Sequence, residues 1–167
     1  MNTVINNQVQ NSFGFRLTEE QEMIRQMTAE FADKEIKPFC GQWDKDDKVP
    51  MDVLAKMHEL GLTNIGIPAE YDGQGLDNLT RYTVIDELGQ RDAGIATTIV
   101  ASSLLATDPI MVGANDEQKK WWFGRMLEGA MCAFCLTEPG AGSDALGMTM
   151  KCTKDGNDWI LNGTKQF

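Results

Sequence analysis

The residues most able to do chemistry lie in one short stretch, Phe134-Cys-Leu-Thr-Glu-Pro-Gly-Ala-Gly-Ser-Asp144. Within it, Gly140–Ala145 satisfies the dinucleotide-binding pattern G-x-G-x-x-G/A. That pattern requires a following helix and an acidic residue about 20 positions on, inside a βαβ unit. The residues that follow alternate like a strand, and Thr164 and Lys165 stand where the acidic residue belongs. We therefore exclude a Rossmann nucleotide site.

What remains is an apolar segment that ends in Thr137 and runs into a Pro-Gly turn. The turn exposes backbone N–H groups beside the hydroxyls of Thr137 and Ser143. Because glycine has no side chain, a flat or phosphorylated ligand can approach such a turn closely. An ordinary glycine-rich connection has the same composition. From the residues alone, both interpretations stay open.

Other reactive residues do not form a recognisable catalytic or metal site. Cys132 and Cys135 have CxxC spacing, but residues three apart on a strand face opposite sides, and no second Cys/His pair completes a zinc site. We expect buried structural thiols there. His58, the only histidine, has no nucleophile motif, so a catalytic triad is not indicated. The acidic stretch 44–47 lacks the glycine and terminal glutamate of a calcium loop.

Two groups of large apolar residues invite a ligand-binding interpretation. The adjacent Trp121 and Trp122 could form an aromatic platform, but after a helix cap such residues more often pack into a core or a subunit contact. The methionines Met23, Met27 and Met57 lie on helical faces and are most simply core residues. We interpret both groups as packing.

Length and charge exclude several functional classes. The chain has 167 residues with 15 basic and 25 acidic side chains, a formal net charge of −10. Such an acidic chain lacks the basic patches with which proteins bind nucleic acid. With 42% hydrophobic residues it can build a real core.

The sequence also bears on cellular location. The N-terminus has no basic start, apolar stretch or cleavage site of a signal peptide, and the first arginine is Arg16. The longest uncharged run, Ala93 to Thr107, is shorter than the roughly 20 apolar residues of a membrane span. We expect a cytoplasmic protein without a membrane span, whose four cysteines are free thiols.

Helical patterns fill the chain up to Gly129. Thr18 to Gln21 has capping-box spacing and predicts a helix that Pro38 closes. Asn115 to Gln118 predicts another cap. Apolar periodicity predicts further helices from Pro50 to Gly61, Asn78 to Leu88 and Ile95 to Leu105.

Strand and turn patterns follow from Met131 on. The predicted strands are Met131–Leu136, Met148–Cys152 and Trp159–Leu161. Asp155-Gly156 and Asn162-Gly163 are hairpin signals. The second signal lies four residues before the end, so we expect a truncated piece of a longer protein.

The predicted class is therefore α+β. A flexible tail (1–16) and an N-terminal all-α helical domain (17–129) are followed by a truncated middle β-domain (130–167), the start of a sandwich or barrel-like domain.

The sequence resembles one family in its motifs. Leu17-Thr-Glu-Glu-Gln21, Glu70-Tyr-Asp-Gly-Gln-Gly-Leu76, Leu136-Thr-Glu-Pro-Gly-Ala-Gly-Ser-Asp144 and Leu161-Asn-Gly-Thr-Lys165 resemble successive landmarks of the acyl-CoA dehydrogenases, in order and spacing. The resemblance covers nearly the whole chain after about residue 14. It implies a helical domain, a β-domain and a C-terminal helical bundle that is absent here.

The resemblance also implies a cofactor, FAD, held between the β-domain and the bundle. By motif match, Phe134, Leu136 and Thr137 would contact the flavin, Thr137 through its hydroxyl and neighbouring backbone groups. Phe134 replaces the tyrosine of some members, which loses a hydroxyl and keeps the aromatic face.

Three further positions follow from the same motif match. Gly142 and Ser143 would line the flavin pyrophosphate or the pantetheine path of an acyl-CoA substrate, with Ser143 donating to the thioester ligand. Phe167 stands where the family carries an aromatic residue in a segment that packs on the flavin.

The implied reaction is α,β-dehydrogenation of a short- or medium-chain acyl-CoA in fatty acid β-oxidation. A carboxylate base removes the α-proton while the β-hydrogen leaves as hydride. The family's base belongs to the absent bundle, so this chain holds no catalytic base, and Glu138 is interpreted as a group that stabilises the turn. We expect the 167-residue chain alone to bind FAD weakly and to be inactive.

The resemblance implies electron-transfer flavoprotein as partner and a homotetramer at full length. The alternatives are an enoyl-CoA reductase, an acyl-CoA oxidase or a flavin monooxygenase of the same superfamily. A non-catalytic helical interaction module is a further alternative from a different class.

Overall fold

The computed structural model describes residues 16–167. These residues form two compact units: a helical unit that ends at Cys132, and a C-terminal unit of Ala133–Phe167. The tail expected for residues 1–16 lies, but for its last residue, outside the described residues.

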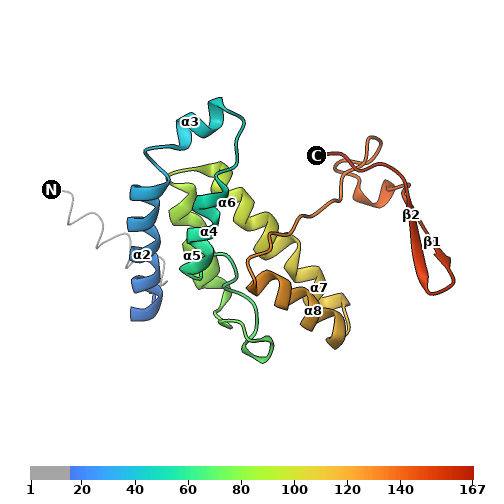
Figure 1. Cartoon of the computed structure of the whole chain (residues 1–167), viewed down its shortest axis with the longest axis horizontal. Helices are drawn as coiled ribbons and strands as arrows, with labels where there is room; N and C mark the ends of the chain where they lie inside the picture. Colours follow the sequence, from blue (N-terminus) through green and yellow to red (C-terminus); the bar gives the residue numbers. More distant parts are fainter. Residues whose placement is uncertain (1–15) are drawn as a thin grey trace. The chain divides into compact units, whose positions relative to one another are not determined.

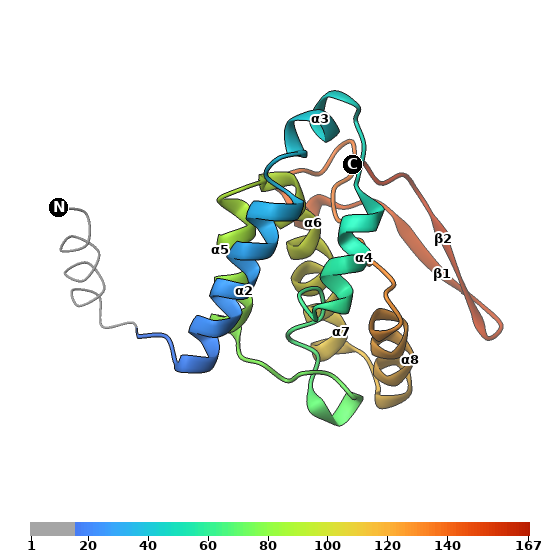
Figure 2. The ribbon, with the colours of Figure 1, turned by 60° about the vertical axis from the view of Figure 1, so that its left-hand side comes forward.

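The helical unit is built from consecutive helices joined by short loops (Figure 1). They are α2 (Glu19–Glu35), α3 (Cys40–Lys45), α4 (Met51–Glu59), the 3-10 turn η1 (Ala69–Tyr71), α5 (Asn78–Gly89), α6 (Ala93–Val100), the π-helix η2 (Ala101–Leu105), α7 (Thr107–Gly113) and α8 (Asp116–Leu127). In two views, α2 and α5 lie side by side (Figure 2). The α+β class predicted from the sequence is confirmed, since the strands come only after these helices.

Side-chain caps begin the helices at the predicted places. The Thr18 hydroxyl accepts from the Gln21 N–H at 3.2 Å while the Gln21 amide accepts from the Thr18 N–H, which is the predicted capping box of α2. Asn115 and Gln118 form the second predicted capping box, at α8. Each box satisfies backbone donors that a helix N-terminus otherwise leaves unpaired. The helix predicted from Pro50 to Gly61 is observed as α4, which ends at Glu59, and Gly61 follows it in the left-handed region with a φ of 73°.

The main core lies among α2, α4, α5 and α6. It consists of buried apolar side chains from these helices and the loops that join them: Ala32, Ile36, Val53, Leu54, Met57, Leu62, Ile65, Val84, Leu88, Ile95, Ala96 and Ile99. A smaller core consists of Ile67 packed against Phe123 and Met126 of α8.

The packing prediction for the methionines holds only in part. Met57 is buried, but Met23 is 65% exposed and Met27 37% exposed on the outer side of α2. Their spacing matches a helical stripe, but the face of α2 that packs inward runs through Thr28 and Ala32 instead. The core prediction for Met23 and Met27 is therefore wrong.

The predicted apolar helix is longer than expected. It continues through the π-helix η2 into α7, and the whole stretch Ala93–Gly113 is 21 residues long. Among the described residues this stretch alone is long and apolar enough to span a membrane, so the length of the uncharged run does not by itself exclude a span. Its side chains Ile95, Ile99 and Leu104 are nevertheless buried in the helical unit, as in the core helix of a globular domain.

The C-terminal unit holds one antiparallel hairpin. Strand β1 (Lys151–Asp155) pairs with β2 (Asp158–Asn162) in the register Lys151 to Asn162 and Asp155 to Asp158. Gly156, with a φ of 59°, lies in the connecting turn and confirms the first hairpin signal. All side chains of both strands are exposed.

One strand prediction and one hairpin prediction are wrong. Within the described residues, Met131–Leu136 forms no strand, because no neighbouring strand pairs with it. Asn162-Gly163 is no hairpin turn either: the chain bends at Gly163, and the Gln166 N–H donates to the Thr137 carbonyl at 2.9 Å.

Candidate functional site

The Pro-Gly turn of the C-terminal unit is closed by two backbone hydrogen bonds. The Glu138 N–H donates to the Ala141 carbonyl at 3.1 Å, and the Ala141 N–H donates to the Glu138 carbonyl at 3.0 Å. Pro139 and Gly140 occupy the tip. The turn therefore has a defined shape of its own, in which Ala141 is buried.

The Glu138 carboxylate anchors this turn to the rest of the unit. Its side chain is 4% exposed. One oxygen accepts from the Thr149 N–H at 2.6 Å and from the Thr149 hydroxyl at 3.0 Å. The other accepts from the Met150 N–H at 3.1 Å and from the Lys165 ammonium at 3.0 Å. The interpretation of Glu138 as a turn-stabilising group agrees with this geometry.

These contacts determine the charge of Glu138. The Thr149 N–H, the Lys165 ammonium and the Met150 N–H all stabilise the ionised carboxylate, and burial opposes them. The hydrogen bonds outweigh burial and lower the pKa of Glu138 to about 2. The anchor is therefore anionic throughout the physiological range.

The two residues before Glu138 are held by their carbonyl groups. The Lys165 ammonium donates to the Leu136 carbonyl at 2.9 Å. The Gln166 N–H donates to the Thr137 carbonyl at 2.9 Å. The segment after Gly163 thus lies along Leu136 and Thr137 and fixes their backbone. A Cβ on Gly163 would lie 2.8 Å from the Cγ of Met150, so the backbone here or Met150 would have to shift to admit a side chain.

Gly140 and Gly142 have open space where a side chain would lie. A Cβ added to Gly140 or Gly142 would meet no atom within 4 Å. Neither glycine has a positive φ. Backbone strain and packing within this unit therefore do not demand glycine at either position, and both leave the backbone accessible to a ligand.

The structure brings most of the predicted site residues to this turn. Thr137 is half-buried beside the Glu138 anchor, and Gly142 and Ser143, which follow the turn, are exposed. Leu136 is 36% exposed and Phe134 43% exposed on the extended segment before it.

The last predicted site residue joins this group through the backbone. Phe167 is fully exposed, and it directly follows Gln166, which is bonded to Thr137.

Sequence reasoning did not single out Lys165. Its ammonium joins the anchor and the Leu136 carbonyl across 27 and 29 residues. The only signal was its place at the end of the motif Leu161–Lys165, which gives no role to the side chain.

The burial and hydrogen bonds of Cys132, Cys135 and His58 indicate no reactive site. Cys132 is half-buried, and its N–H donates to the Ser102 hydroxyl, but Cys135 is exposed, so the buried-thiol prediction is wrong for Cys135. The extended segment leaves that side chain without a packing partner strand. His58 lies on α4, 3.1 Å from the Thr63 hydroxyl. Among the described residues, no group of His, Cys, Asp and Glu could hold a metal ion.

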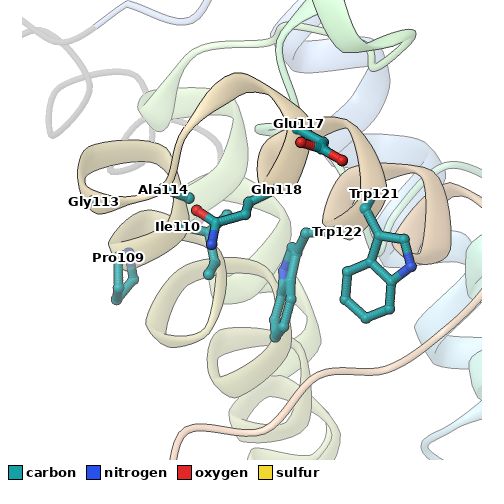
Figure 3. Close-up of a pocket in the computed structure, with 8 residues that line it drawn as sticks. All are labelled: Pro109, Ile110, Gly113, Ala114, Glu117, Gln118, Trp121 and Trp122. Carbon is teal, nitrogen blue, oxygen red and sulfur yellow. The ribbon is translucent and has the colours of Figure 1, made fainter. Parts of the chain in front are cut away.

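A hollow of about 650 Å³ lies between α7 and α8. Figure 3 shows Pro109 and Ile110 of α7 on one side of it and Gln118 and Trp122 of α8 on the other. Trp122 packs on the smaller core, which confirms packing for that residue, whereas Trp121 is 66% exposed. The hollow belongs to the helical unit and holds none of the predicted site residues.

Comparison with known proteins places the chain in a family. The family model of the acyl-CoA dehydrogenase N-terminal domain matches residues 18–130, and that of the middle domain matches residues 133–167. This chain belongs to the acyl-CoA dehydrogenase family. The resemblance of its motifs is thereby confirmed.

One curated relative of this acyl-CoA dehydrogenase family chain is the 3-(aryl)acrylate reductase of Clostridium sporogenes (strain ATCC 15579). It is 40% identical over 153 residues, which make up 90% of this chain and 40% of the reductase. The chain thus spans well under half the length of this relative.

Solved structures resemble the chain in fold as well. A chain in the structure of the electron transferring flavoprotein of Acidaminococcus fermentans has a TM-score of 0.86 and 38% identity, covering 92% of this chain and 40% of that one. Butyryl-CoA dehydrogenase from Megasphaera elsdenii has a TM-score of 0.83 and 30% identity, covering 92% and 41%. Acyl-CoA dehydrogenase from Bacillus anthracis, complexed with FAD, has a TM-score of 0.78 and 32% identity, covering 90% and 26%.

Proposed function

We propose that the protein to which this chain belongs is an FAD-dependent acyl-CoA dehydrogenase. It converts a short- or medium-chain acyl-CoA thioester to a trans-2-enoyl-CoA in fatty acid β-oxidation. Family membership supports a flavin oxidoreductase, and the butyryl-CoA dehydrogenase of Megasphaera elsdenii supports a short acyl chain.

One observation carries this proposal: backbone hydrogen bonds and the Glu138 carboxylate hold the turn at Glu138–Ala141, yet Gly140 and Gly142 leave open space where a side chain would lie. FAD is a flat ring with a pyrophosphate, and both parts need a backbone that they can approach closely. Gly140 and Gly142, with no atom within 4 Å of an added Cβ, fit that need. The related structure from Bacillus anthracis is complexed with FAD.

Each site residue has a distinct task in this proposal. Phe134 and Leu136 offer exposed apolar surface to the flavin ring, and Thr137 offers its hydroxyl. Gly142 and Ser143 line the path of the pyrophosphate or of the pantetheine, with the Ser143 hydroxyl toward the thioester ligand. Phe167 adds a second aromatic side chain next to the Thr137 contact.

When bound, FAD supplies the electron acceptor that no amino-acid side chain provides. In this proposal the residues of this chain bind and orient the cofactor and the substrate. We do not assign Glu138 as the base that removes the α-proton, because its carboxylate is fully engaged with Thr149, Met150 and Lys165. A carboxylate with these partners and a pKa of about 2 is a poor proton acceptor at neutral pH.

A second candidate function is the reverse reaction, reduction of a double bond conjugated to a carboxyl group. The 3-(aryl)acrylate reductase of Clostridium sporogenes, at 40% identity, favours it. The same turn serves either direction, since both need the cofactor in the same place.

The partners and the location complete the proposal. We propose electron-transfer flavoprotein as electron acceptor, which the similarity to a chain in the Acidaminococcus fermentans structure supports. A homotetramer and a cytoplasmic location are proposed from the family resemblance and the sequence.

The test uses the gene product at its full coding length. A purified yellow protein that bleaches with butyryl- or octanoyl-CoA and reduces electron-transfer flavoprotein is the expected result. Oxygen consumption without that acceptor would identify an oxidase instead. Bleaching by a reduced donor followed by recovery on an arylacryloyl substrate would identify the reductase. A colourless protein that takes up no FAD would overturn the proposal.

A further inference from the structure

Lys165 has an unusual pair of contacts within the C-terminal unit. Its ammonium donates to a carboxylate oxygen of Glu138 at 3.0 Å and to the carbonyl oxygen of Leu136 at 2.9 Å. The side chain of Lys165 is 23% exposed. It therefore links the fixed anchor of the turn with the peptide bond that precedes Thr137.

The contact between Lys165 and the Leu136 carbonyl fixes the direction in which the Thr137 N–H points. The Leu136 carbonyl and the Thr137 N–H belong to the same peptide group, and the described residues contain no cis peptide bond. In a trans peptide the carbonyl and the N–H point in opposite directions. Because the Leu136 carbonyl faces Lys165, the Thr137 N–H faces away from Lys165.

The neighbouring peptide groups are occupied. The Thr137 carbonyl accepts from the Gln166 N–H, and the Glu138 N–H donates to the Ala141 carbonyl. The Thr137 N–H, by contrast, has no hydrogen-bond partner among the described residues. It is a donor on the side of the segment that faces away from Lys165.

Glu138 does not depend on Lys165 for its place. The N–H groups of Thr149 and Met150 and the Thr149 hydroxyl hold its carboxylate independently. If Lys165 is removed, these bonds remain and the turn stays anchored. Only the Leu136–Thr137 peptide is released, so the effect falls on the donor rather than on the fold.

We propose that Lys165 is a positioning residue for the cofactor: supported by Glu138, it holds the Leu136–Thr137 peptide so that the Thr137 N–H donates to the flavin ring. This inference rests on the proposed function. It adds that a side chain 28 residues away in the sequence determines the direction of this backbone donor. A hydrogen bond to a flavin ring atom changes the electronic properties of the ring, and so its absorption and its potential.

The test compares Lys165→Met and Lys165→Arg with the wild type in the gene product at its full coding length. Lys154→Met is the matched control, because Lys154 is exposed on β1. Three quantities are measured: the Kd for FAD by fluorescence titration, the visible absorption spectrum and midpoint potential of the bound flavin, and the melting temperature. We expect the Lys165→Met Kd to rise about 10-fold, which corresponds to losing one hydrogen bond between the Thr137 N–H and the ring. Its flavin spectrum and potential shift, while Lys165→Arg stays near the wild type and Lys154→Met is unchanged.

The outcomes separate this inference from the function on which it rests. A wild type that binds no FAD contradicts the proposed function. A wild type that binds FAD, with a Lys165→Met variant of equal Kd, spectrum and potential, contradicts the role of Lys165 and leaves the function standing. If Lys165→Met does not fold, Lys165→Ala is used, which likewise removes the ammonium donor. Wild-type affinity and spectrum in Lys165→Ala would equally overturn the inference.

Discussion

At the scale of single residues, Glu138 makes stability depend on pH in a predictable direction. Its pKa is about 2 in the folded chain, against an ordinary value of 4.5. A lowered folded-state pKa means that the carboxylate stabilises the fold fully above pH 4.5, and that this contribution disappears as the pH falls toward 2. We predict that the C-terminal unit loosens over this range.

Hydrogen exchange at the Thr149 and Met150 amides measures this, since both donate to Glu138. Glu138→Gln should exchange faster than wild type at neutral pH, and the difference should shrink as the pH is lowered. Asp158→Asn, at an exposed position of β2, is the control. A difference between Glu138→Gln and wild type that does not change with pH would contradict the prediction.

A second residue-scale prediction concerns the glycines of the turn. Gly142→Ala adds a Cβ that meets nothing within 4 Å, at a φ that alanine tolerates. The melting temperature should therefore stay the same or rise slightly, because alanine restricts the unfolded chain. The Kd for FAD in the gene product at its full coding length should rise about 10-fold, because the methyl group occupies the space of the cofactor.

Gly163→Ala is the matched control for this prediction. Its Cβ would lie 2.8 Å from the Cγ of Met150 and 3.1 Å from the Met150 Cα, so it should lower the melting temperature. Were Gly142→Ala to lower the melting temperature and leave the FAD affinity unchanged, glycine at 142 would be a structural requirement and the interpretation of the open turn would be wrong.

At the scale of elements, one buried carboxylate joins α2 to α5. The Glu87 side chain on α5 is 6% exposed and accepts from Arg25 of α2 at 2.8 Å and from Arg91. Arg91 also pairs with Asp33 of α2 at 3.0 Å. Glu87→Gln removes the charge between two guanidinium groups and should destabilise the helical unit by about 2 kcal/mol.

Glu128→Gln provides the comparison in a chemical denaturation experiment. Its pair with Arg125 at 2.7 Å is 60% and 67% exposed, and a surface pair of this kind contributes less than about 0.5 kcal/mol. Equal destabilisation by the two substitutions would show that burial of Glu87 does not matter.

The elements that the sequence predicts are those with local causes. The capping boxes at Thr18 and Asn115 and the hairpin turn at Gly156 each need only neighbouring residues, and all three are present. A strand needs a partner elsewhere, which is why the apolar run Met131–Leu136 indicated a strand that does not form. The helices α3 and α7 were not predicted for a different reason. They are only 6 and 7 residues long, which is too short for a recognisable apolar periodicity.

In the candidate site, too, the features with local causes could be predicted and those that depend on distant residues could not. The motif located Thr137, Gly142 and Ser143 because their types are set by local turn chemistry. The hydrogen bonds from Lys165 to Glu138 and Leu136 form only because the chain after the hairpin folds back along the turn. No local sequence pattern predicts these long-range contacts. Glu138 was recognised as a stabiliser of the turn, but its partners were not.

At the scale of the whole molecule, the two units differ in what holds them together. The buried apolar side chains lie almost entirely in the helical unit, and Ala141 is the one in the C-terminal unit among the described residues. An isolated two-stranded hairpin is marginal in water. The helical unit therefore has a core of its own, whereas the C-terminal unit relies on the Glu138 contacts and one exposed hairpin.

This difference predicts how the 167-residue chain behaves. Amides of α4, α5 and α6 should exchange slowly, at rates limited by unfolding of the helical unit, while amides of β1 and β2 should exchange quickly. Because the proposed cofactor turn belongs to the weaker unit, FAD has to order that unit as it binds. We predict a Kd for FAD at least about 100-fold weaker for this chain than for the gene product at its full coding length, with no turnover of acyl-CoA by the chain alone.

Hydrogen exchange followed by mass spectrometry and a fluorescence titration with FAD measure both parts on the same preparation. Residues 17–132 expressed alone are the matched control: they should keep the slow exchange of the helices and bind no FAD, because every predicted cofactor residue lies in Ala133–Phe167. Tight FAD binding by the 167-residue chain would show that the Glu138 and Lys165 contacts suffice to hold the turn. Slow exchange throughout β1 and β2 would show that the C-terminal unit is stable without a core of its own.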